Sequence, residues 1–266
     1  MGQCEIVTDL DDPRLGAFRD LRQRRSQRGD GRVIAEGQLV VQRLLASPLS
    51  VETVVVEAGR HRWAEDWTDR CTVLELGKSQ IRELAGFDFH RGVLASAERP
   101  PQRILHADAI TAAESPLLFV CGVSDPENLG SIIRSATAFG VTDIAHDRTT
   151  ADPLATRVLR VSMGTAFKQR FWWSDDVAAD VRRLAREAGY RTVATTLKPG
   201  ARTLNEFCRE IAEQRSRLAL LVGSEAAGLP QTVEEAVTDR VMIPMRRQTD
   251  SLNVAVATGI VLHALA

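Results

Sequence analysis

The stretch LLFVCGVSDPENLGSIIRSATAFGV at residues 117–141 passes from an apolar run through a turn containing Pro, Asn and Gly into a segment of helical character. This order predicts a buried strand followed by a helix. The same alternation continues to the end of the chain. Strands are predicted at residues 117–123, 141–146, 192–196, 218–223 and 240–243. Parallel strands joined by crossover helices give an open α/β sheet.

The front of the chain shows a smaller α/β pattern. Leu39, Val40, Leu44 and Leu45 recur at helical spacing. Strands are predicted at 51–56 and 72–76, with a helix at 60–68 between them. Prolines at 100, 101 and 116 mark a linker. We therefore predict a first domain at 1–98, a linker at 99–116 and a second domain at 117–266.

Composition narrows the function classes. With 266 residues, 44% of them hydrophobic and a net charge of −1, the chain is predicted to be globular, and no global charge points to nucleic acid or membrane. Arginines account for 31 of its 34 cations, and the guanidinium group suits phosphate and carboxylate. Its four cysteines form no CxxC pair, and no apolar run reaches ~18 residues. We expect a cytoplasmic protein without a metal site, disulfide framework or membrane span.

Ligands of open α/β sheets bind beyond the carboxyl ends of the strands. Three loops there stand out: residues 125–141, LLVGSEAAGLP at 220–230 and VMIPMRRQTDSLNVAVA at 241–257. None contains a GxGxxG fingerprint or a GxxxxGK[ST] phosphate loop, which argues against nicotinamide, flavin and nucleotide triphosphate ligands.

Together the three loops resemble the motifs of the SpoU, or TrmH-like, branch of the SPOUT superfamily of RNA 2′-O-ribose methyltransferases. The matching residues are Asn128, Gly130 and Arg134; Gly223, Glu225 and Gly228; and Ile243, Pro244, Met245, Ser251, Leu252 and Asn253. The front part resembles the substrate-binding domain often fused to these enzymes, a fold like that of kink-turn-binding ribosomal proteins, through AEGQLVVQRLLAS (35–47) and GFDFHRGVLASAERP (86–100).

The resemblance implies a deep trefoil knot in the second domain, S-adenosylmethionine held bent in the knot loops, and an obligate homodimer. It implies transfer of a methyl group to a ribose 2′-hydroxyl of RNA, with ribosomal RNA favoured over transfer RNA because of the front domain. A non-catalytic RNA-binding or ribosome-assembly protein of the same fold is the alternative, and a transferase acting on protein or small molecules is another.

The resemblance assigns catalysis to Arg134, Asn128, Glu225, Ser251 and Asn253. Because a guanidinium stays protonated, we expect Arg134 to contact the phosphate or ribose and stabilise developing negative charge rather than act as a base. Four of these residues also have a simpler structural interpretation. Arg134 pairs with an acid on a helix surface, Asn128 or Ser251 caps a helix, and Glu225 offsets a helix dipole.

The resemblance also assigns cofactor contacts. The residues are Thr195, Thr196, Gly223, Ile243, Met245, Ser251 and Leu252. Gly223 is expected to allow close backbone approach, and Ile243 and Leu252 to flank the adenine. Core packing is the alternative for these two apolar residues, and an ordinary turn is the alternative for the threonines.

Two basic stretches are candidates for RNA contact. One is residues 157–170, which contain no acid, and the other holds six arginines between 19 and 32. The candidate residues are Arg25, Arg28, Arg157, Arg160 and Lys168. A solvated charged face is the alternative, although phosphate contacts must supply affinity somewhere in a near-neutral RNA-binding protein. The last residues, 252–266, are apolar almost all round and predict a helix that must be covered, either by its own domain or by a second copy of the chain.

Overall fold

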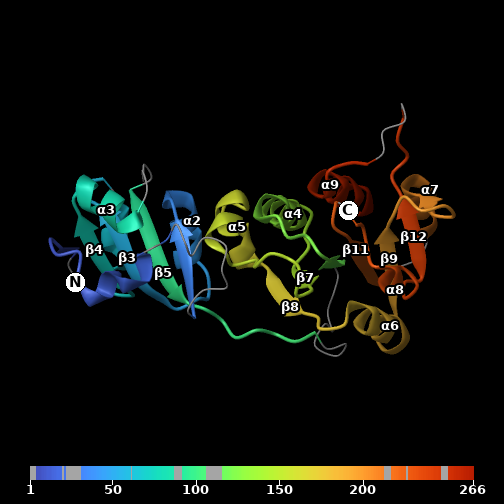
Figure 1. Ribbon diagram of the computed structural model, residues 1–266, viewed down its shortest axis with the longest axis horizontal. Coiled ribbons are helices and arrows are strands. Elements are labelled where there is room, and N and C mark those ends of the chain that lie inside the picture. Colours follow the sequence, from blue (N-terminus) through green and yellow to red (C-terminus); the bar gives the residue numbers. More distant parts are fainter. Residues whose placement is uncertain are drawn as a thin grey trace. The chain divides into compact units, whose positions relative to one another are not determined.

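A computed structural model of the chain describes residues 4–19, 21, 31–60, 62–86, 92–105, 116–212, 217–225, 227–246 and 251–266. Its internal contacts divide the chain into two compact units (Figure 1). Unit 1 comprises Met1–Pro101 and Asp152–Phe167, and unit 2 comprises Gln102–Ala151 and Lys168–Ala266. The segment 152–167, which the sequence placed in the second domain, therefore packs with unit 1. The domain bounds at 98 and 116 stay predictions.

Unit 1 is built on a five-stranded mixed sheet with the order β1-β4-β3-β5-β2. The strands are β1 (Glu5–Ile6), β2 (Arg32–Glu36), β3 (Val51–Glu57), β4 (Thr72–Leu76) and β5 (Val93–Glu98). Among the described residues of this unit, the helices are α2 (Gln38–Leu45), α3 (Lys78–Ala85) and α5 (Thr156–Val161), with short 3₁₀ helices at Pro13–Phe18 and Arg62–Trp67. The predicted strands at 51–56 and 72–76 are confirmed. The predicted helix at 60–68 is wrong in type, because the chain forms a 3₁₀ helix there.

Unit 2 is a seven-stranded sheet with the order β10-β12-β9-β11-β6-β7-β8, and all its pairings are parallel. The strands are β6 (Leu117–Val120), β7 (Asp143–His146), β8 (Arg170–Trp173), β9 (Tyr190–Thr195), β10 (Arg202–Thr203), β11 (Arg217–Val222) and β12 (Asp239–Met242). The helices are α4 (Pro126–Ala138), α6 (Val177–Glu187), α7 (Leu204–Ala212), α8 (Gln231–Glu234) and α9 (Val254–Leu265), with a 3₁₀ helix at Thr165–Lys168 that begins in unit 1. The predicted parallel α/β sheet is confirmed, and β8 and β10 are additional strands.

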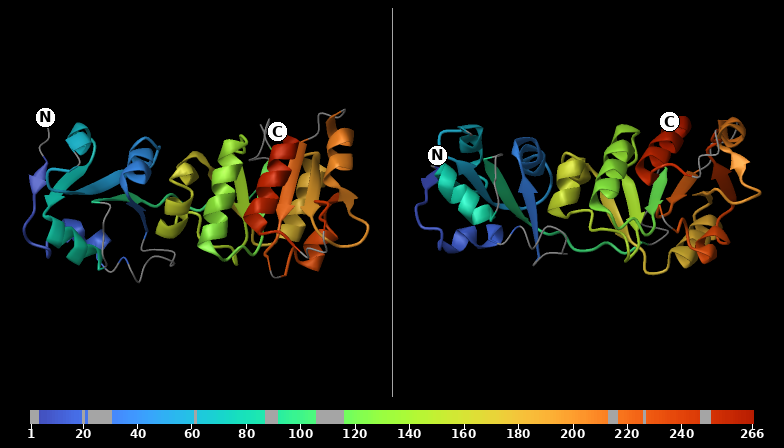
Figure 2. Two further views of the ribbon diagram at one scale, coloured as in Figure 1. Left: turned by 90° about the horizontal axis from the view of Figure 1, so that it is seen from above. Right: turned by 45° about the horizontal axis from the view of Figure 1, so that its top comes forward.

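Helices cover both faces of this sheet. Helices α4, α7 and α9 lie on one face, and α6 and α8 lie on the other (Figure 1). Figure 2 shows α4 and α9 side by side. The core between sheet and helices contains Phe119, Val181, Leu184 and Leu221, which are fully buried. Burial of both faces explains why the strands read as nearly continuous apolar runs.

Helix α9 begins at Val254, two residues later than predicted, because Asn253 is its N-cap. Its inner face buries Thr258, Val261 and Leu262, whereas 52% of Val256 and 39% of Ile260 remain exposed. The single chain therefore covers only part of this apolar helix. No helix within the described residues is both long enough and apolar enough to cross a membrane.

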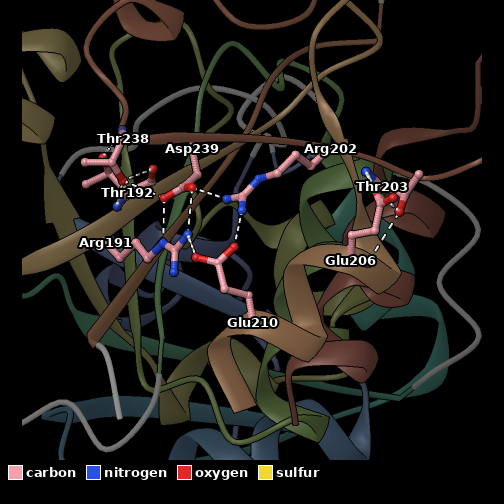
Figure 3. A network of polar contacts seen from close by, with 8 residues as sticks. All are labelled: Arg191, Thr192, Arg202, Thr203, Glu206, Glu210, Thr238 and Asp239. Carbon is pink, nitrogen blue, oxygen red and sulfur yellow. Dashed lines mark hydrogen bonds and ion pairs between the residues drawn. The ribbon is translucent and has the colours of Figure 1, made fainter. Parts of the chain in front are cut away.

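Helix α7 is fixed to the sheet by an ionic network (Figure 3). Asp239 accepts hydrogen bonds from Arg191 Nε at 2.7 Å and Nη2 at 2.8 Å, and also from Arg202. Glu210 of α7 accepts from Arg191 Nη2 at 2.7 Å and from Arg202. Both guanidinium groups lie over the Phe207 ring, at 4.9 and 5.3 Å from its centroid. Burial acts to raise the pKa of Asp239, but the hydrogen bonds from Arg191 and Thr238 and the charges of Arg191 and Arg202 outweigh it and lower the pKa.

We predict that Asp239→Asn lowers the free energy of unfolding by about 2–3 kcal/mol at pH 7, because it removes a largely buried charge-assisted acceptor. A lowered pKa in the folded state means that this contribution is present above the unfolded value of about 3.9 and is lost as the pH falls through the folded value. Urea unfolding from pH 7 to 3 measures the difference from wild type, which is expected to shrink below about pH 4. Glu187→Gln, at the exposed end of α6, is the matched control. Equal losses for the two variants would contradict the prediction.

Candidate functional site

Three loops at the carboxyl edge of the unit 2 sheet enclose one cavity of about 510 Å³. They follow β9, β11 and β12, and the first turns of α9 close the cavity. The lining residues are Thr195–Pro199, Gly223–Glu225, Ala227–Leu229, Glu234, Val241, Ile243, Met245, Ser251, Leu252, Val254, Ala257 and Val261. Its volume lies within the range of roughly 300–1,000 Å³ that is typical of small-molecule sites.

All seven residues predicted to contact a cofactor lie on the wall of this cavity. They are Thr195, Thr196, Gly223, Ile243, Met245, Ser251 and Leu252. Ile243 and Leu252 are only half-buried, so neither belongs to the core, and the core-packing alternative does not describe them. Their contact with a cofactor stays a prediction.

The side chain of Asn253 joins the three sequence motifs. Its Nδ2 donates to Asn128 Oδ1 at 2.9 Å and to Glu225 Oε1 at 2.5 Å. Its Oδ1 accepts from the backbone N–H groups of Ala255 at 3.0 Å and Val256 at 3.3 Å. Asn253 thus caps α9 and also connects that helix to α4 and to the loop after β11.

The structure decides between several helix-capping interpretations. Asp125, not Asn128, caps α4, because its Oδ1 accepts from the N–H of Glu127 at 3.0 Å. Asn128 is therefore available to hold Asn253. Ser251 is not a cap either, because Asn253 occupies that position, and Ser251 instead lines the cavity.

The Glu225 side chain lies at the beginning of α9, although Glu225 and Val254 are 29 residues apart in the sequence. Its Oε1 accepts from Asn253 Nδ2 and, at 3.4 Å, from the N–H of Val254. The carboxylate therefore faces the positive end of the α9 dipole rather than that of the next helix in sequence, which begins at Gln231. It lines the cavity of its own chain.

Arg134 lies further along α4, two turns beyond Asn128, and is exposed. It does not line the cavity, and within the described residues its guanidinium forms no ion pair. The interpretation of Arg134 as one half of a surface ion pair therefore receives no support from this part of the chain. Its role in catalysis stays a prediction.

The loop after β11 turns back so tightly that it requires glycine. A Cβ added at Gly223 would lie 2.2 Å from the carbonyl carbon of Gly228 and 2.4 Å from the nitrogen of Leu229. The N–H of Gly228, which has a φ of +67°, donates to the Ser224 carbonyl at 2.9 Å. The lack of a side chain at Gly223 therefore lets the backbone of this loop pack closely against itself, at Gly228 and Leu229. The loop forms one wall of the cavity.

A half-buried acid supports the neighbouring loops. Asp147, directly after β7, accepts from the N–H of Gly122 at 3.1 Å and from the N–H and hydroxyl of Thr150 at 2.9 and 2.7 Å. Burial acts to raise its pKa, but these hydrogen bonds and one from Thr149 outweigh it, so the pKa lies below its usual range. The ionised carboxylate therefore holds together the loops that follow β6 and β7, the first of which leads into α4.

The predicted RNA contacts fall into different parts of the chain. Arg25 and Arg28 lie outside the described residues. Arg160 is paired at 3.8 Å with Glu36, which is buried, and both belong to unit 1. Arg157 also belongs to unit 1, whereas Lys168 belongs to unit 2 and is exposed. Contact of these residues with RNA stays a prediction.

The sequence analysis missed two charged residues of the cavity, Lys198 and Glu234. Lys198 follows a predicted strand, so the rule that ligands bind at the carboxyl ends of strands identifies its loop. Glu234 carries no comparable signal, because Glu235 beside it has the same side chain and is exposed. Among the described residues, no group of three or more His, Cys, Asp or Glu side chains is arranged to hold a metal ion.

Comparisons with known proteins agree with this arrangement. Residues 115–263 match the model of the SpoU rRNA Methylase family. An uncharacterized tRNA/rRNA methyltransferase of Mycobacterium tuberculosis is 38% identical over 265 residues, covering 97% of this chain and 90% of the relative. The 23S rRNA (guanosine-2′-O-)-methyltransferase RlmB of Bordetella pertussis is 30% identical, covering 87% of this chain and 95% of the relative.

Solved structures extend the similarity to the fold. The crystal structure of an AdoMet-bound rRNA methyltransferase from Sinorhizobium meliloti superposes with a TM-score of 0.82 at 30% identity, covering 99% of this chain and 98% of that one. The family model spans more than half of the chain, and its range contains all three motifs that meet at the cavity. This chain therefore belongs to the SpoU rRNA methylase family.

Proposed function

We propose that this chain transfers a methyl group from S-adenosylmethionine to a ribose 2′-hydroxyl of ribosomal RNA. The observation that carries the proposal is the Asn253 side chain, which joins Asn128 and Glu225 beside a cavity of cofactor size. Family membership and the rRNA methyltransferases among the relatives support it. Transfer RNA remains the second candidate substrate, because the Mycobacterium tuberculosis relative is described as a tRNA/rRNA methyltransferase.

The residues present fit S-adenosylmethionine. Leu229, Val241, Ile243 and Leu252 provide apolar surface suited to an adenine ring, and other lining residues contribute hydroxyl and charged groups. The bound cofactor supplies an activated methyl group on a sulfonium, so the protein's task is to position the acceptor oxygen and stabilise its charge.

Arg134 is assigned to the RNA. Its guanidinium remains protonated, so it stabilises negative charge developing on the ribose oxygen and contacts the adjoining phosphate. Asn128 lies on the same helix, and the Asn128–Asn253–Glu225 contacts fix α4 relative to the cavity. An intact set of these polar residues favours an enzyme over a non-catalytic RNA-binding protein of the same fold.

We propose a knotted path for the last segment of the chain. In the sheet, β12 lies beyond β9, on the side away from β11, yet α9 packs against α4. The described residues between β12 and α9, among them Ile243, Met245, Ser251 and Leu252, line the cavity together with the loops that follow β9 and β11. Passage through the loops there, rather than over them, gives the trefoil knot that the family resemblance implies.

We also propose a homodimer in the cytoplasm, with unit 1 as a kink-turn-type RNA-binding domain. Support for the dimer comes from Val256 and Ile260, which remain exposed on α9. Arg134 is exposed on α4, the helix packed beside α9, and does not line its own chain's cavity. A second copy covering α9 would bring Arg134 near the partner's site.

We predict that Gly223→Ala weakens S-adenosylmethionine binding at least tenfold, or about 1.4 kcal/mol, because the added Cβ would collide with backbone atoms of the cavity wall. Isothermal titration calorimetry measures the affinity, and circular dichroism checks the fold. Gly16→Ala is the control, since a Cβ there meets nothing within 4 Å. Wild-type affinity in the Gly223 variant would refute the role of this loop.

Arg134→Ala is expected to lower methyl transfer to RNA by about a hundredfold or more, as is usual when a group stabilising transition-state charge is removed. Affinity for S-adenosylmethionine should stay within a few-fold, because Arg134 does not line the cavity. Transfer of labelled methyl groups measures turnover, with Arg182→Ala on the exposed side of α6 as the control. Unchanged turnover would remove Arg134 from the mechanism.

Val256→Asp should dissociate the dimer, because it introduces a charge into the exposed apolar surface of α9. Sedimentation velocity at micromolar concentration is the measurement, and an increase in the dissociation constant of at least tenfold is expected. Leu39→Asp, at an exposed apolar residue of α2, is the control. A wild-type protein that is monomeric and active would overturn the dimer proposal.

A further inference from the structure

The cavity contains one ion pair that lies outside all three motifs. Lys198, in the loop after β9, donates through its ammonium group to Glu234 Oε2. Thr196 Oγ1 donates to the other carboxylate oxygen, Glu234 Oε1, at 2.9 Å. All three residues line the cavity, so this pair is part of its wall.

The two partners differ in burial. Glu234 is only 5% exposed, whereas the Lys198 side chain is 56% exposed and lies at the rim. Helix α8 ends at Glu234, and Arg240 Nη2 donates to the Glu234 carbonyl at 2.8 Å, which fixes the backbone of this residue. The Glu234 carboxylate is thus held in place on the cavity wall, where a bound ligand would cover it.

The carboxylate retains unused acceptor capacity. An ionised carboxylate has about four lone-pair sites, and Thr196 and Lys198 occupy one on each oxygen. Lys198 has three N–H donors and no acceptor. The pair therefore offers an acceptor and a donor side by side, at a place where burial of unsatisfied polar groups is costly.

A vicinal diol matches this arrangement. Each hydroxyl both donates and accepts, so one can donate to Glu234 while its neighbour accepts from Lys198 without breaking the ion pair. The amino-acid end of the cofactor is a poorer match, because its two charges would have to compete with a pair that is already formed. We propose that Lys198 and Glu234 bind the ribose 2′- and 3′-hydroxyls of S-adenosylmethionine and so position the cofactor. This inference rests on the proposed function.

The experiment compares ligands that share the ribose but differ elsewhere. Calorimetry measures binding of S-adenosylmethionine, of 5′-methylthioadenosine, which lacks the amino-acid end, and of the deoxy analogue 2′,3′-dideoxy-5′-methylthioadenosine, which lacks both ribose hydroxyls. Glu234→Leu removes the acceptor at a buried position and keeps a side chain of similar size, and Lys198→Met removes the donor at the rim. Glu235→Leu, the exposed neighbour on α8, is the matched control.

We expect Glu234→Leu to lower the affinities for S-adenosylmethionine and for methylthioadenosine by the same factor, about tenfold. Lys198→Met should lower both affinities by a few-fold. The deoxy analogue should bind wild type and Glu234→Leu within about threefold of each other, and Glu235→Leu should match wild type. Thermal unfolding identifies any loss of fold. Should Glu234→Leu be misfolded, the Lys198→Met comparison across the three ligands decides.

Two results would overturn the inference while leaving the proposed function intact. Weakening of S-adenosylmethionine alone would assign the pair to the amino-acid end, and unchanged binding of every ligand would make the pair purely structural. Failure of the wild-type protein to bind S-adenosylmethionine at all would instead overturn the proposed function.

Discussion

The position of α9 depends on a single amide. The Asn253 side chain has one acceptor oxygen and two donor hydrogens. The oxygen satisfies the first N–H groups of α9, and the nitrogen holds Asn128 and Glu225. Since α9 closes the cavity, a shift of this helix would open the site and separate the three motifs. The capping of a helix and the assembly of the candidate site are therefore one interaction.

The opposite end of the sheet supplies the rigidity that this arrangement needs. Arg191 and Asp239 lie near the starts of β9 and β12, and with Arg202 and Glu210 they tie α7 to the sheet (Figure 3). Helix α7 in turn packs against α9. Charged pairs thus stabilise the amino edge, so the carboxyl edge can consist of glycine turns and polar loops that are shaped for a ligand.

The sequence predicted the elements whose signal is local. Long apolar runs bounded by turns located the strands at 51–56, 72–76 and 218–223, and the rule for open sheets located the loops around the cavity. The sequence did not predict β8, because its residues, RFWW, follow a basic stretch that resembles a charged surface. It did not predict β5, because the residues of that strand, VLASAE, are mostly small. Tertiary packing determines which residue caps α4. It also determines that Glu234 is buried while Glu235 is exposed. Neighbouring residues of similar chemistry give no sequence signal for such choices.

The same reasoning limits what the arginine content says about RNA. Many arginines of the described residues are engaged in ion pairs, among them Arg14, Arg19, Arg32, Arg60, Arg99, Arg160, Arg170, Arg183, Arg191 and Arg202. Such groups stabilise the fold or balance surface charge, and a phosphate would have to displace an existing carboxylate. Arg134 and Lys168 are exposed and form no ion pair within the described residues, so they can meet a phosphate without that competition. Affinity for RNA then depends on where unpaired cations lie, and the number of arginines in the composition is a poor guide to it.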